Sequence, residues 1–194
     1  MTTRVALFGG SFNPPHVAHQ LVALDVLETQ PVDELWFVPT FTHPFGKQLV
    51  SYADRVAMCE LAAAPLGPRV RVSRAEEELA QRPDFVASRT LDLVDHLAAP
   101  GRELRLVVGT DILGETAKWH RWDQVVARAP LIVVGRTGYA LPAGSVATGV
   151  AMPEISATRV RELLAAGGPG APELAGLLPR EVLRYIATHH LYTS

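Results

Sequence analysis

The sequence predicts an α/β protein with a doubly wound parallel sheet, because short apolar runs alternate along the chain with segments of helical periodicity. Strands that alternate with helices favour a parallel sheet with helices on both faces. The expected strands are Val5–Phe8, Leu35–Val38, Val70–Val72, Leu104–Val108 and Leu131–Val134. The expected helices between them are His16–Glu28, Tyr52–Ala64, Phe85–Leu97 and Trp119–Ala127.

The last third of the chain changes in pattern. Glycine, proline and small residues predict loops at Thr137–Gly149 and Gly167–Gly170. A terminal helix with proline at its start is expected at Pro179–Ile186. There is no internal repeat, and the glycine clusters are too short to be domain linkers. We therefore expect a single domain over residues 1–194, with a small C-terminal helical portion from about residue 155.

Composition narrows the classes of partner. The chain has 194 residues, of which 48% are hydrophobic, enough for one sizeable core. A formal net charge of −2 provides no electrostatic footprint for duplex nucleic acid, although local basic clusters can serve a small anion. The single cysteine, Cys59, excludes an intramolecular disulfide and is expected to be a buried core residue. No apolar run approaches membrane length, so we expect a cytoplasmic protein that does not enter a membrane.

Ligands of parallel sheets gather outside the carboxyl ends of the strands, where the strand order reverses. Three segments follow expected strands directly: the loop that begins at Gly9, the loop Pro39–Lys47, and the tripeptide Gly109–Asp111. All three can therefore face one crevice.

The first of these segments, Gly-Gly-Ser-Phe-Asn-Pro-Pro-His-Val-Ala-His at residues 9–19, suggests phosphate chemistry. A strand, a glycine turn and a helix start expose backbone N–H groups and a positive dipole end, which together bind anions. His16 and His19 are three residues apart and can share one face of the first turn. A purely structural turn explains the same residues, since short motifs often match by chance. Metal ligation is a weaker alternative, because no Cys or acidic ligand lies nearby.

A second segment, Ile155–Leu164, combines a helix start with positive charge. Ser156 suits the N-cap, and Thr158, Arg159 and Arg161 fall in the first turns. Capping alone explains Ser156, but positive charge there opposes the helix dipole. A bound polyphosphate would offset that cost, because arginine forms bidentate bonds to phosphate.

Together, Gly-Gly-Ser-Phe-Asn-Pro-Pro-His-x-x-His and Ile-Ser-x-Thr-x-x-Arg resemble the paired signature of nucleotidyltransferases related to class I tRNA synthetases. Among these, the chain is most similar to the bacterial nicotinate-mononucleotide adenylyltransferases, almost end to end, including the closing Leu-Pro-Arg-Glu-Val-Leu-Arg-Tyr-Ile. The resemblance implies a Rossmann-like nucleotidyltransferase fold and a step of NAD biosynthesis. In that step the phosphate of nicotinate mononucleotide attacks the α-phosphorus of ATP, and pyrophosphate leaves.

The resemblance also implies roles for residues. The catalytic group would be His16, His19 and Arg161, with the histidines acting as donors to phosphate rather than as nucleophiles. The residues expected to bind ATP are Gly9, Gly10, Ser11, Phe12, His16, His19, Gly109, Asp111, Ser156, Thr158 and Arg161. Mg²⁺ would be required, bound through phosphate oxygens and water rather than by a protein metal site. Asp111 is either a distant helper of that ion or a helix N-cap.

For the acceptor, the resemblance points to Trp119 stacking on the pyridine ring. Ser88, Arg89 and Thr90, near a helix start, would receive the nicotinate carboxylate. Lys47 and Arg136 are further candidates for phosphate contacts. The competing interpretations are an ordinary Trp119–Trp122 hydrophobic pair and solvated surface charges.

The chain departs from the family pattern at several positions, mostly on the acceptor side. Ala18 stands where glycine is usual, and Ala157 where serine is common. Thr-His-Pro-Phe-Gly-Lys at residues 42–47 replaces Pro-Pro-His-Lys, and Arg89 replaces an aromatic residue. The catalytic half of the motif is therefore intact while the acceptor half is altered. The alternative functions are transfer to nicotinamide mononucleotide or phosphopantetheine, cytidylyl transfer, and nucleotide binding without catalysis.

Overall fold

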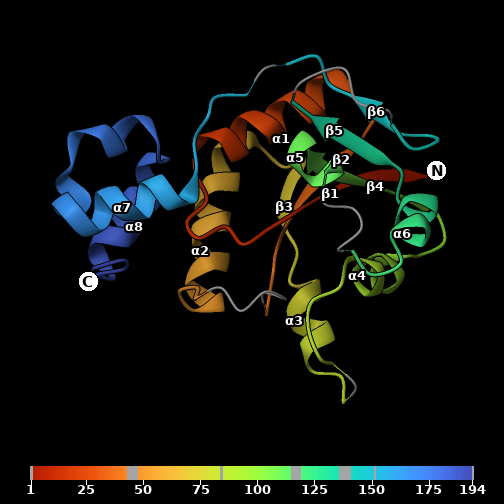
Figure 1. The fold of residues 1–194 in the computed structure, drawn as a ribbon, viewed down its shortest axis with the longest axis horizontal. Coiled ribbons are helices and arrows are strands. Elements are labelled where there is room, and N and C mark those ends of the chain that lie inside the picture. Colours follow the sequence, from red (N-terminus) through yellow and green to blue (C-terminus); the bar gives the residue numbers. More distant parts are fainter. Residues whose placement is uncertain are drawn as a thin grey trace.

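The computed structural model has a six-stranded sheet at its centre, and every neighbouring pair of strands is parallel (Figure 1). The structure describes residues 2–42, 48–83, 85–114, 119–135, 141–150 and 152–193. The strands are β1 (Thr3–Gly10), β2 (Glu34–Pro39), β3 (Val70–Val72), β4 (Arg102–Gly109), β5 (Leu131–Val134) and β6 (Val146–Ala147). The predicted doubly wound parallel sheet is confirmed, and all five expected strands are present.

The strand order β3-β2-β1-β4-β5-β6 places the reversal point between β1 and β4. From β1 the chain moves outward through β2 and β3, and then returns to β4 on the other side of β1. Phe8 pairs with Val107, so Gly10 and Gly109 end these two strands side by side at the carboxyl edge of the sheet. A crevice for a ligand is expected at this reversal.

Helices cover both faces of the sheet (Figure 1). The α-helices are α1 (Val17–Thr29), α2 (Tyr52–Ala63), α3 (Ala75–Ala80), α4 (Thr90–Leu97), α5 (Thr110–Leu113), α6 (Trp122–Arg128), α7 (Ala157–Gly167) and α8 (Arg180–Thr188). Single 3-10 turns occupy η1 (Ala64–Leu66), η3 (Gly168–Gly170) and η4 (Pro172–Gly176).

Alternation along β1 divides the core between the two faces. Val5 and Leu7 pack with residues of α4 and α6, whereas Ala6 packs with residues of α1 and α2. This period-two pattern is that of a strand buried on both faces. Cys59 is fully buried in the second group, as predicted, and burial raises the pKa of its thiol.

The C-terminal helices build a third apolar cluster on the outer side of α2 (Figure 1, blue). Met58 and Ala62 of α2 pack there against Val160 of α7 and Val182 of α8. The Tyr185 hydroxyl also donates to Asp54 at 3.0 Å, across the same junction. These contacts fix α7 against the side of α2. The division into one domain with a small helical portion remains a prediction.

Two expected helices begin later in the structure than the sequence pattern indicates. The helix predicted from Phe85 begins at Thr90, because Phe85 turns into the core and Arg89 has extended backbone angles, φ −125° and ψ 129°. The helix predicted from Trp119 begins at Trp122, because Arg121 has a left-handed φ of 53°. A left-handed residue cannot continue a right-handed helix.

Other differences are additions. The segment expected to be a loop at Thr137–Gly149 contains β6, which pairs with β5, while residues 137–140 lie outside the described ranges. The short helix α3 was not expected, and a helix near α5 was expected only under the interpretation that made Asp111 an N-cap. Asp111 lies inside α5, which begins at Thr110, so it is not the N-cap that one interpretation made it. Within the described ranges, none of the helices has the length and apolar character needed to cross a membrane.

Candidate active site

The loop after β1, residues 11–16, lies at the strand reversal and is folded around Phe12. This residue is buried in a left-handed conformation, φ 45°, with ring contacts to Phe8, Phe37 and His19. A Cβ on Gly10 would lie 3.3 Å from the Phe12 ring, so glycine permits this close approach. A Cβ on Gly9 would meet nothing within 4 Å. The backbone at Gly9 is therefore open to a ligand.

His16 and His19 stand together at the start of α1, with ring centroids 3.7 Å apart. The backbone N–H of His16, which is the N-cap, donates to His19 Nδ1 at 3.0 Å. Because Nδ1 accepts this bond, the proton of neutral His19 is carried by Nε2. His16 is only 6% exposed, and its Nδ1 has no hydrogen-bond partner in the structure. A buried polar atom without a partner indicates a place where a ligand completes the bonding.

Both imidazoles are neutral near pH 7 in the free protein. Burial lowers the pKa of His16 to about 4. Burial, together with the neighbouring His16, holds the pKa of His19 well below its usual range. An arriving phosphate would oppose this effect, since a nearby anion raises the pKa of an imidazole.

The second motif lies at the start of α7, beside the loop of the first. Ser156 is the N-cap and accepts from the Arg159 N–H at 3.2 Å, as the sequence predicted. Arg161 donates from Nη1 to the Asn13 carbonyl at 2.8 Å and from Nη2 to the Thr158 hydroxyl at 3.3 Å. The structure therefore brings Arg161 against the loop that carries His16, although 148 positions separate Arg161 from Asn13.

Asn13, which the sequence analysis did not single out, joins several segments at this point. It is 3% exposed, and its side-chain oxygen accepts from the Val50 N–H at 3.2 Å and the Tyr192 hydroxyl at 2.9 Å. Its carbonyl receives Arg161. The first motif, the start of α2 and the end of the chain thus converge on one residue. An Asn-Pro step reads as an ordinary turn, so no local signal predicts this function.

Arg55 of α2 is a second residue that the sequence analysis missed. It is 1% exposed, and its guanidinium donates to the carbonyls of Ser11 at 2.9 Å, Val50 at 3.2 Å and Phe41 at 3.5 Å. A signal for it exists in the sequence. Arg55 lies three and four positions before Met58 and Cys59, on the helix face that these apolar residues occupy.

The remaining ATP-binding candidates lie at the ends of the neighbouring strands. Gly109 ends β4 beside Val134 of β5, and α5 with Asp111 follows directly. Within the described residues, no three His, Cys, Asp or Glu side chains come together as a metal cluster.

Of the acceptor candidates, Ser88, Arg89 and Thr90 lie at the start of α4, as expected. The Thr42 N–H donates to the Ser88 hydroxyl oxygen at 3.3 Å, which ties the loop after β2 to this helix start. Glu76 of α3 lies alongside: burial raises the pKa of its carboxyl group, while hydrogen bonds from Ser88 and from the Phe41 N–H oppose that effect. Glu76 thus lies close to the Ser88 side chain at the start of α4.

Trp119 and Trp122 form an edge-to-face pair, with centroids 5.2 Å apart and planes at 78°, and both pack on the core that α4 shares. The Trp119–Trp122 pair, which was the alternative to stacking of Trp119 on the pyridine ring, is thus present. Trp119 is nevertheless partly exposed. Lys47 and Arg136 lie outside the described residues.

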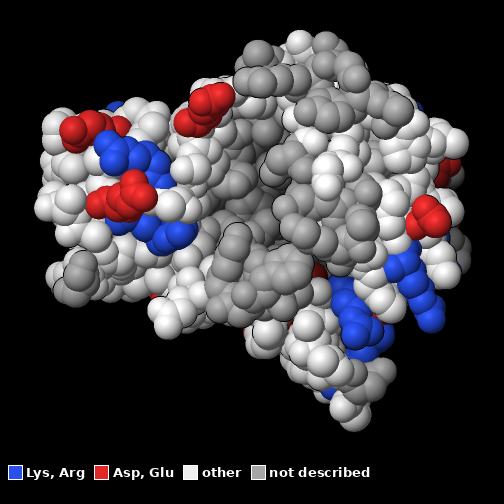
Figure 2. Space-filling view, viewed as in Figure 1, with Lys and Arg blue, Asp and Glu red and all other residues white. Residues whose placement is uncertain are grey.

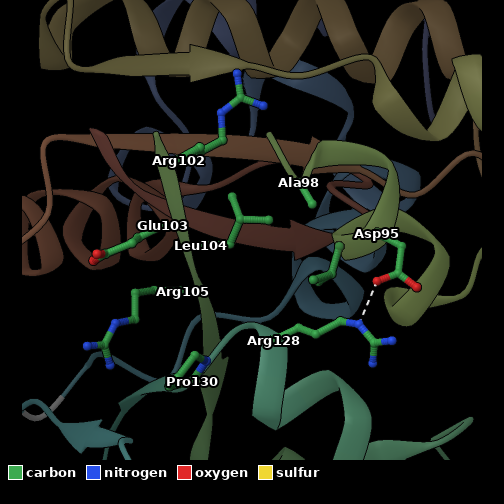
Figure 3. Close-up of a pocket in the computed structure, with 9 residues that line it drawn as sticks. Asp95, Ala98, Arg102, Glu103, Leu104, Arg105, Arg128 and Pro130 are labelled. Carbon is green, nitrogen blue, oxygen red and sulfur yellow. Dashed lines mark ion pairs between the residues drawn. The ribbon is translucent and has the colours of Figure 1, made fainter. Parts of the chain in front are cut away.

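A cavity of about 430 Å³ lies at the opposite, amino-terminal end of β4 and contains none of the candidate residues. Three arginines line it, but Figure 3 shows Arg102, Arg105 and Arg128 pointing in different directions, with Arg128 paired to Asp95 at 2.8 Å. The guanidinium groups do not converge on a common point, so this cavity is not the anion site.

These features, paired imidazoles at the strand reversal and an arginine from a distant helix start bonded to the same loop, are those of a nucleotidyltransferase. The family model for cytidylyltransferase-like proteins matches residues 7–163, a range that includes both motifs. A probable nicotinate-nucleotide adenylyltransferase of Anaeromyxobacter dehalogenans is 48% identical over 97% of this chain and 96% of its own length. A probable enzyme of the same name from Myxococcus xanthus is 37% identical over 97% and 94%.

The chain belongs to the nicotinate-nucleotide adenylyltransferase family, which confirms the resemblance drawn from the two motifs. The fold is also shared with a solved structure from Plasmodium falciparum, nicotinic acid mononucleotide adenylyltransferase complexed with NaAD. That structure superposes with a TM-score of 0.79 over 98% of this chain and 97% of its own, at 16% identity.

Proposed function

We propose that this protein transfers the adenylyl group of ATP to nicotinate mononucleotide, forming nicotinate adenine dinucleotide and pyrophosphate. The observation that carries the proposal is the bond from Arg161 Nη1 to the Asn13 carbonyl, which joins the arginine of the second motif to the loop that leads to the histidines of the first. The names of the full-length relatives support the same reaction.

In the reaction, a phosphate oxygen of the mononucleotide bonds to the α-phosphorus of ATP while the bond from that phosphorus to the bridging oxygen breaks. The protein need supply little covalent chemistry, because alignment and stabilisation of charge dominate such transfers. His19 presents an Nε2–H donor, since its Nδ1 is occupied. We assign His16 and His19 to the phosphates at the reacting centre, where they donate hydrogen bonds. A neutral imidazole can already donate, so neither histidine must be charged before the nucleotide binds.

The leaving pyrophosphate is assigned to the start of α7. Thr158 accepts a bond from Arg161, and Ser156 accepts one from the Arg159 N–H, so both hydroxyls keep their protons for phosphate oxygens. Arg161 adds the positive charge, and the helix dipole has the favourable sign. Gly9, Gly10 and Ser11 would approach the nucleotide with their backbone.

Mg²⁺ is assigned to the oxygens of the triphosphate and to water. The donor chemistry fits, because Mg²⁺ prefers hard oxygen ligands such as phosphate and keeps several waters. Asp111 is assigned as a distant helper of that ion. When bound, the ion neutralises charge that develops on the phosphates.

For the acceptor, we assign the nicotinate carboxylate to the start of α4, where Arg89 and Thr90 add donors to a positive dipole end. Trp119 would stack on the pyridine ring, and Lys47 and Arg136 would contact the acceptor phosphate. An acid is favoured over the neutral amide at such a position.

The test is a panel assay with purified protein, Mg²⁺ and each pairing of ATP or CTP with nicotinate mononucleotide, nicotinamide mononucleotide or phosphopantetheine. We expect pyrophosphate and dinucleotide in a one-to-one ratio, with the highest kcat/KM for ATP and nicotinate mononucleotide. Another preferred pair would reassign the substrate. Tight ATP binding with no turnover of any acceptor would replace the enzyme assignment with that of a nucleotide-binding protein.

A further inference from the structure

The guanidinium of Arg55 is buried, and its bonds to three backbone carbonyls suggest a role beyond stabilising the fold. Those carbonyls come from three separate segments: Ser11 in the loop after β1, Phe41 after β2, and Val50 before α2. All three segments lie at the carboxyl edge of the sheet. Arg55 therefore holds together three backbone segments that lie next to the candidate site.

The positive charge of Arg55 is not neutralised by the described residues around it. None of the described carboxylates forms an ion pair with it. The titratable neighbours that act on it are Tyr52, Cys59 and Tyr192, and burial raises the pKa of each, so they are uncharged at pH 7. A guanidinium stays protonated even where burial lowers its pKa. A buried charge without a counter-charge is costly, so an anion nearby would offset the cost.

The bond to Ser11 also orients the loop. The Ser11 carbonyl points toward Arg55, and in a planar trans peptide the N–H lies opposite the carbonyl, so the Phe12 N–H points away from Arg55. The same guanidinium thus supplies positive charge on one side of the loop and leaves the Phe12 N–H directed to the other side. Positive charge and free backbone N–H groups are the two properties of an anion-binding loop.

We propose that Arg55 is a positioning residue for the triphosphate of ATP, acting through the Ser11 peptide and through its own uncompensated charge without touching the nucleotide. The proposal rests on the proposed function for its ligand. It predicts that Arg55 governs ATP binding specifically, rather than stability alone.

Arg69 provides a matched control within the same chain. It also donates to three carbonyls, of Leu27 at 2.9 Å, Val32 at 2.9 Å and Asp33 at 3.1 Å. These lie at the amino-terminal edge of the sheet, where Arg69 is 45% exposed and lies 3.5 Å from Glu28. Arg69 thus performs the same structural work far from the candidate site.

The experiment compares Arg55→Lys and Arg55→Gln with Arg69→Lys and Arg69→Gln in the full chain. Calorimetry with Mg-ATP and no acceptor gives the Kd, thermal melting gives stability, and initial rates give the KM for nicotinate mononucleotide separately. For Arg55→Gln we expect the ATP Kd to rise about tenfold, because the buried positive charge and the orientation of the Ser11 peptide are both lost. For Arg55→Lys, which keeps the charge and fewer bonds, we expect about threefold to fivefold. The acceptor KM should stay within about twofold in both.

Melting temperatures should fall in both the Arg55 and the Arg69 series, but the ATP Kd should stay near the wild-type value in the Arg69 series. If Arg55→Gln does not fold, the Lys pair decides. An Arg55→Lys protein whose ATP Kd equals that of Arg69→Lys would overturn the proposal, as would equal losses in ATP and acceptor affinity. Because ATP binding is measured without an acceptor, this outcome is independent of whether nicotinate mononucleotide is the true substrate.

Discussion

Arg4 and Arg71, toward the amino-terminal edge of the sheet, meet carboxylates, whereas Arg55 and Arg161, at the carboxyl edge, meet only carbonyl and hydroxyl oxygens among the described residues. Arg4 pairs with Asp33 at 3.4 Å and Arg71 with Glu34 at 2.9 Å at the first edge. Arg55 and Arg161 at the second edge bond to Ser11, Asn13 and Thr158. The positive charges of Arg4 and Arg71 are thus neutralised, whereas those of Arg55 and Arg161 remain for a ligand.

The outer helices follow the pattern of the amino-terminal edge. On the face drawn in Figure 2, blue and red side chains lie next to each other over the C-terminal helices, where Arg159 pairs with Glu162 and Arg184 with Glu181. The charges over these helices are therefore mixed and paired, unlike those of Arg55 and Arg161.

Histidine shows the same contrast. His96 is bonded to Glu78 at 2.8 Å and to Arg82 at 3.2 Å on the surface between α3 and α4. His16 and His19 have each other and aromatic neighbours, and His16 Nδ1 has no partner. Substitution of His96, whose two ring nitrogens have partners, and of His16, whose Nδ1 has none, should therefore have different effects on the rate.

The largest expected effect is that of His16→Ala on the rate. Loss of a donor at the reacting phosphate should lower kcat by about two orders of magnitude or more, measured as pyrophosphate release at saturating substrates. His96→Ala is the control and should keep kcat within about twofold. A nearly unchanged rate in His16→Ala would mean that the reacting phosphate lies elsewhere.

The next largest effect should come from Arg161, compared with an arginine that is paired with a carboxylate. Arg161→Met should lower kcat/KM for ATP by about ten- to a hundredfold, because one charged bond to the leaving pyrophosphate is lost. Arg184→Met, on the neighbouring helix and paired with Glu181, is the matched control with no expected change. Equal kinetics in the two variants would remove Arg161 from the active site.

Stability should depend on pH through His16. Its pKa is about 4 in the folded protein against an ordinary 6.5, so its contribution is fully present above pH 6.5 and is lost as the pH falls toward 4. Integrated over that window, the free energy of unfolding should fall by about 3 kcal/mol. Denaturant unfolding at pH 7 and pH 4 measures this, and His16→Gln should reduce the difference by that amount. The same loss in both proteins would exclude His16 as its source.

The smallest effect belongs to the amino-terminal edge. Arg128→Ala breaks an exposed ion pair with Asp95, in which both side chains are nearly half exposed. We expect at most about 1 kcal/mol of destabilisation by denaturant unfolding, and unchanged kinetics. A loss of activity would instead show that the cavity lined by Arg102 and Arg128 communicates with the active site.

The fold could be predicted from the sequence where a single physical signal dominated. Apolar runs predicted the five longer strands, and the Ser156 N-cap was predicted from local chemistry and is present. The two-residue strand β6 was missed because it is exposed and carries no apolar run. The start of α6 was misplaced because Arg121 has a left-handed backbone, which residues other than glycine rarely adopt and which the apolar pattern does not indicate.

The candidate site divides in the same way. His16, His19 and Arg161 could be proposed from the two motifs, because each motif is a short stretch of neighbouring residues whose types indicate phosphate binding. Asn13 and Arg55 were missed because their functions arise from contacts with segments remote in the sequence, such as Tyr192 and Ser11. Residues that position a site through contacts with distant segments are hard to recognise from their neighbours in the sequence.

The central claim is that the two motifs hold one triphosphate. The most direct measurement is a crystal structure with a non-hydrolysable ATP analogue and Mg²⁺. The account predicts α-phosphate oxygens at about 3 Å from an imidazole of His16 or His19, and β- or γ-phosphate oxygens at about 3 Å from Arg161 in the same molecule. A nucleotide whose phosphates contact only one of the two motifs would contradict it.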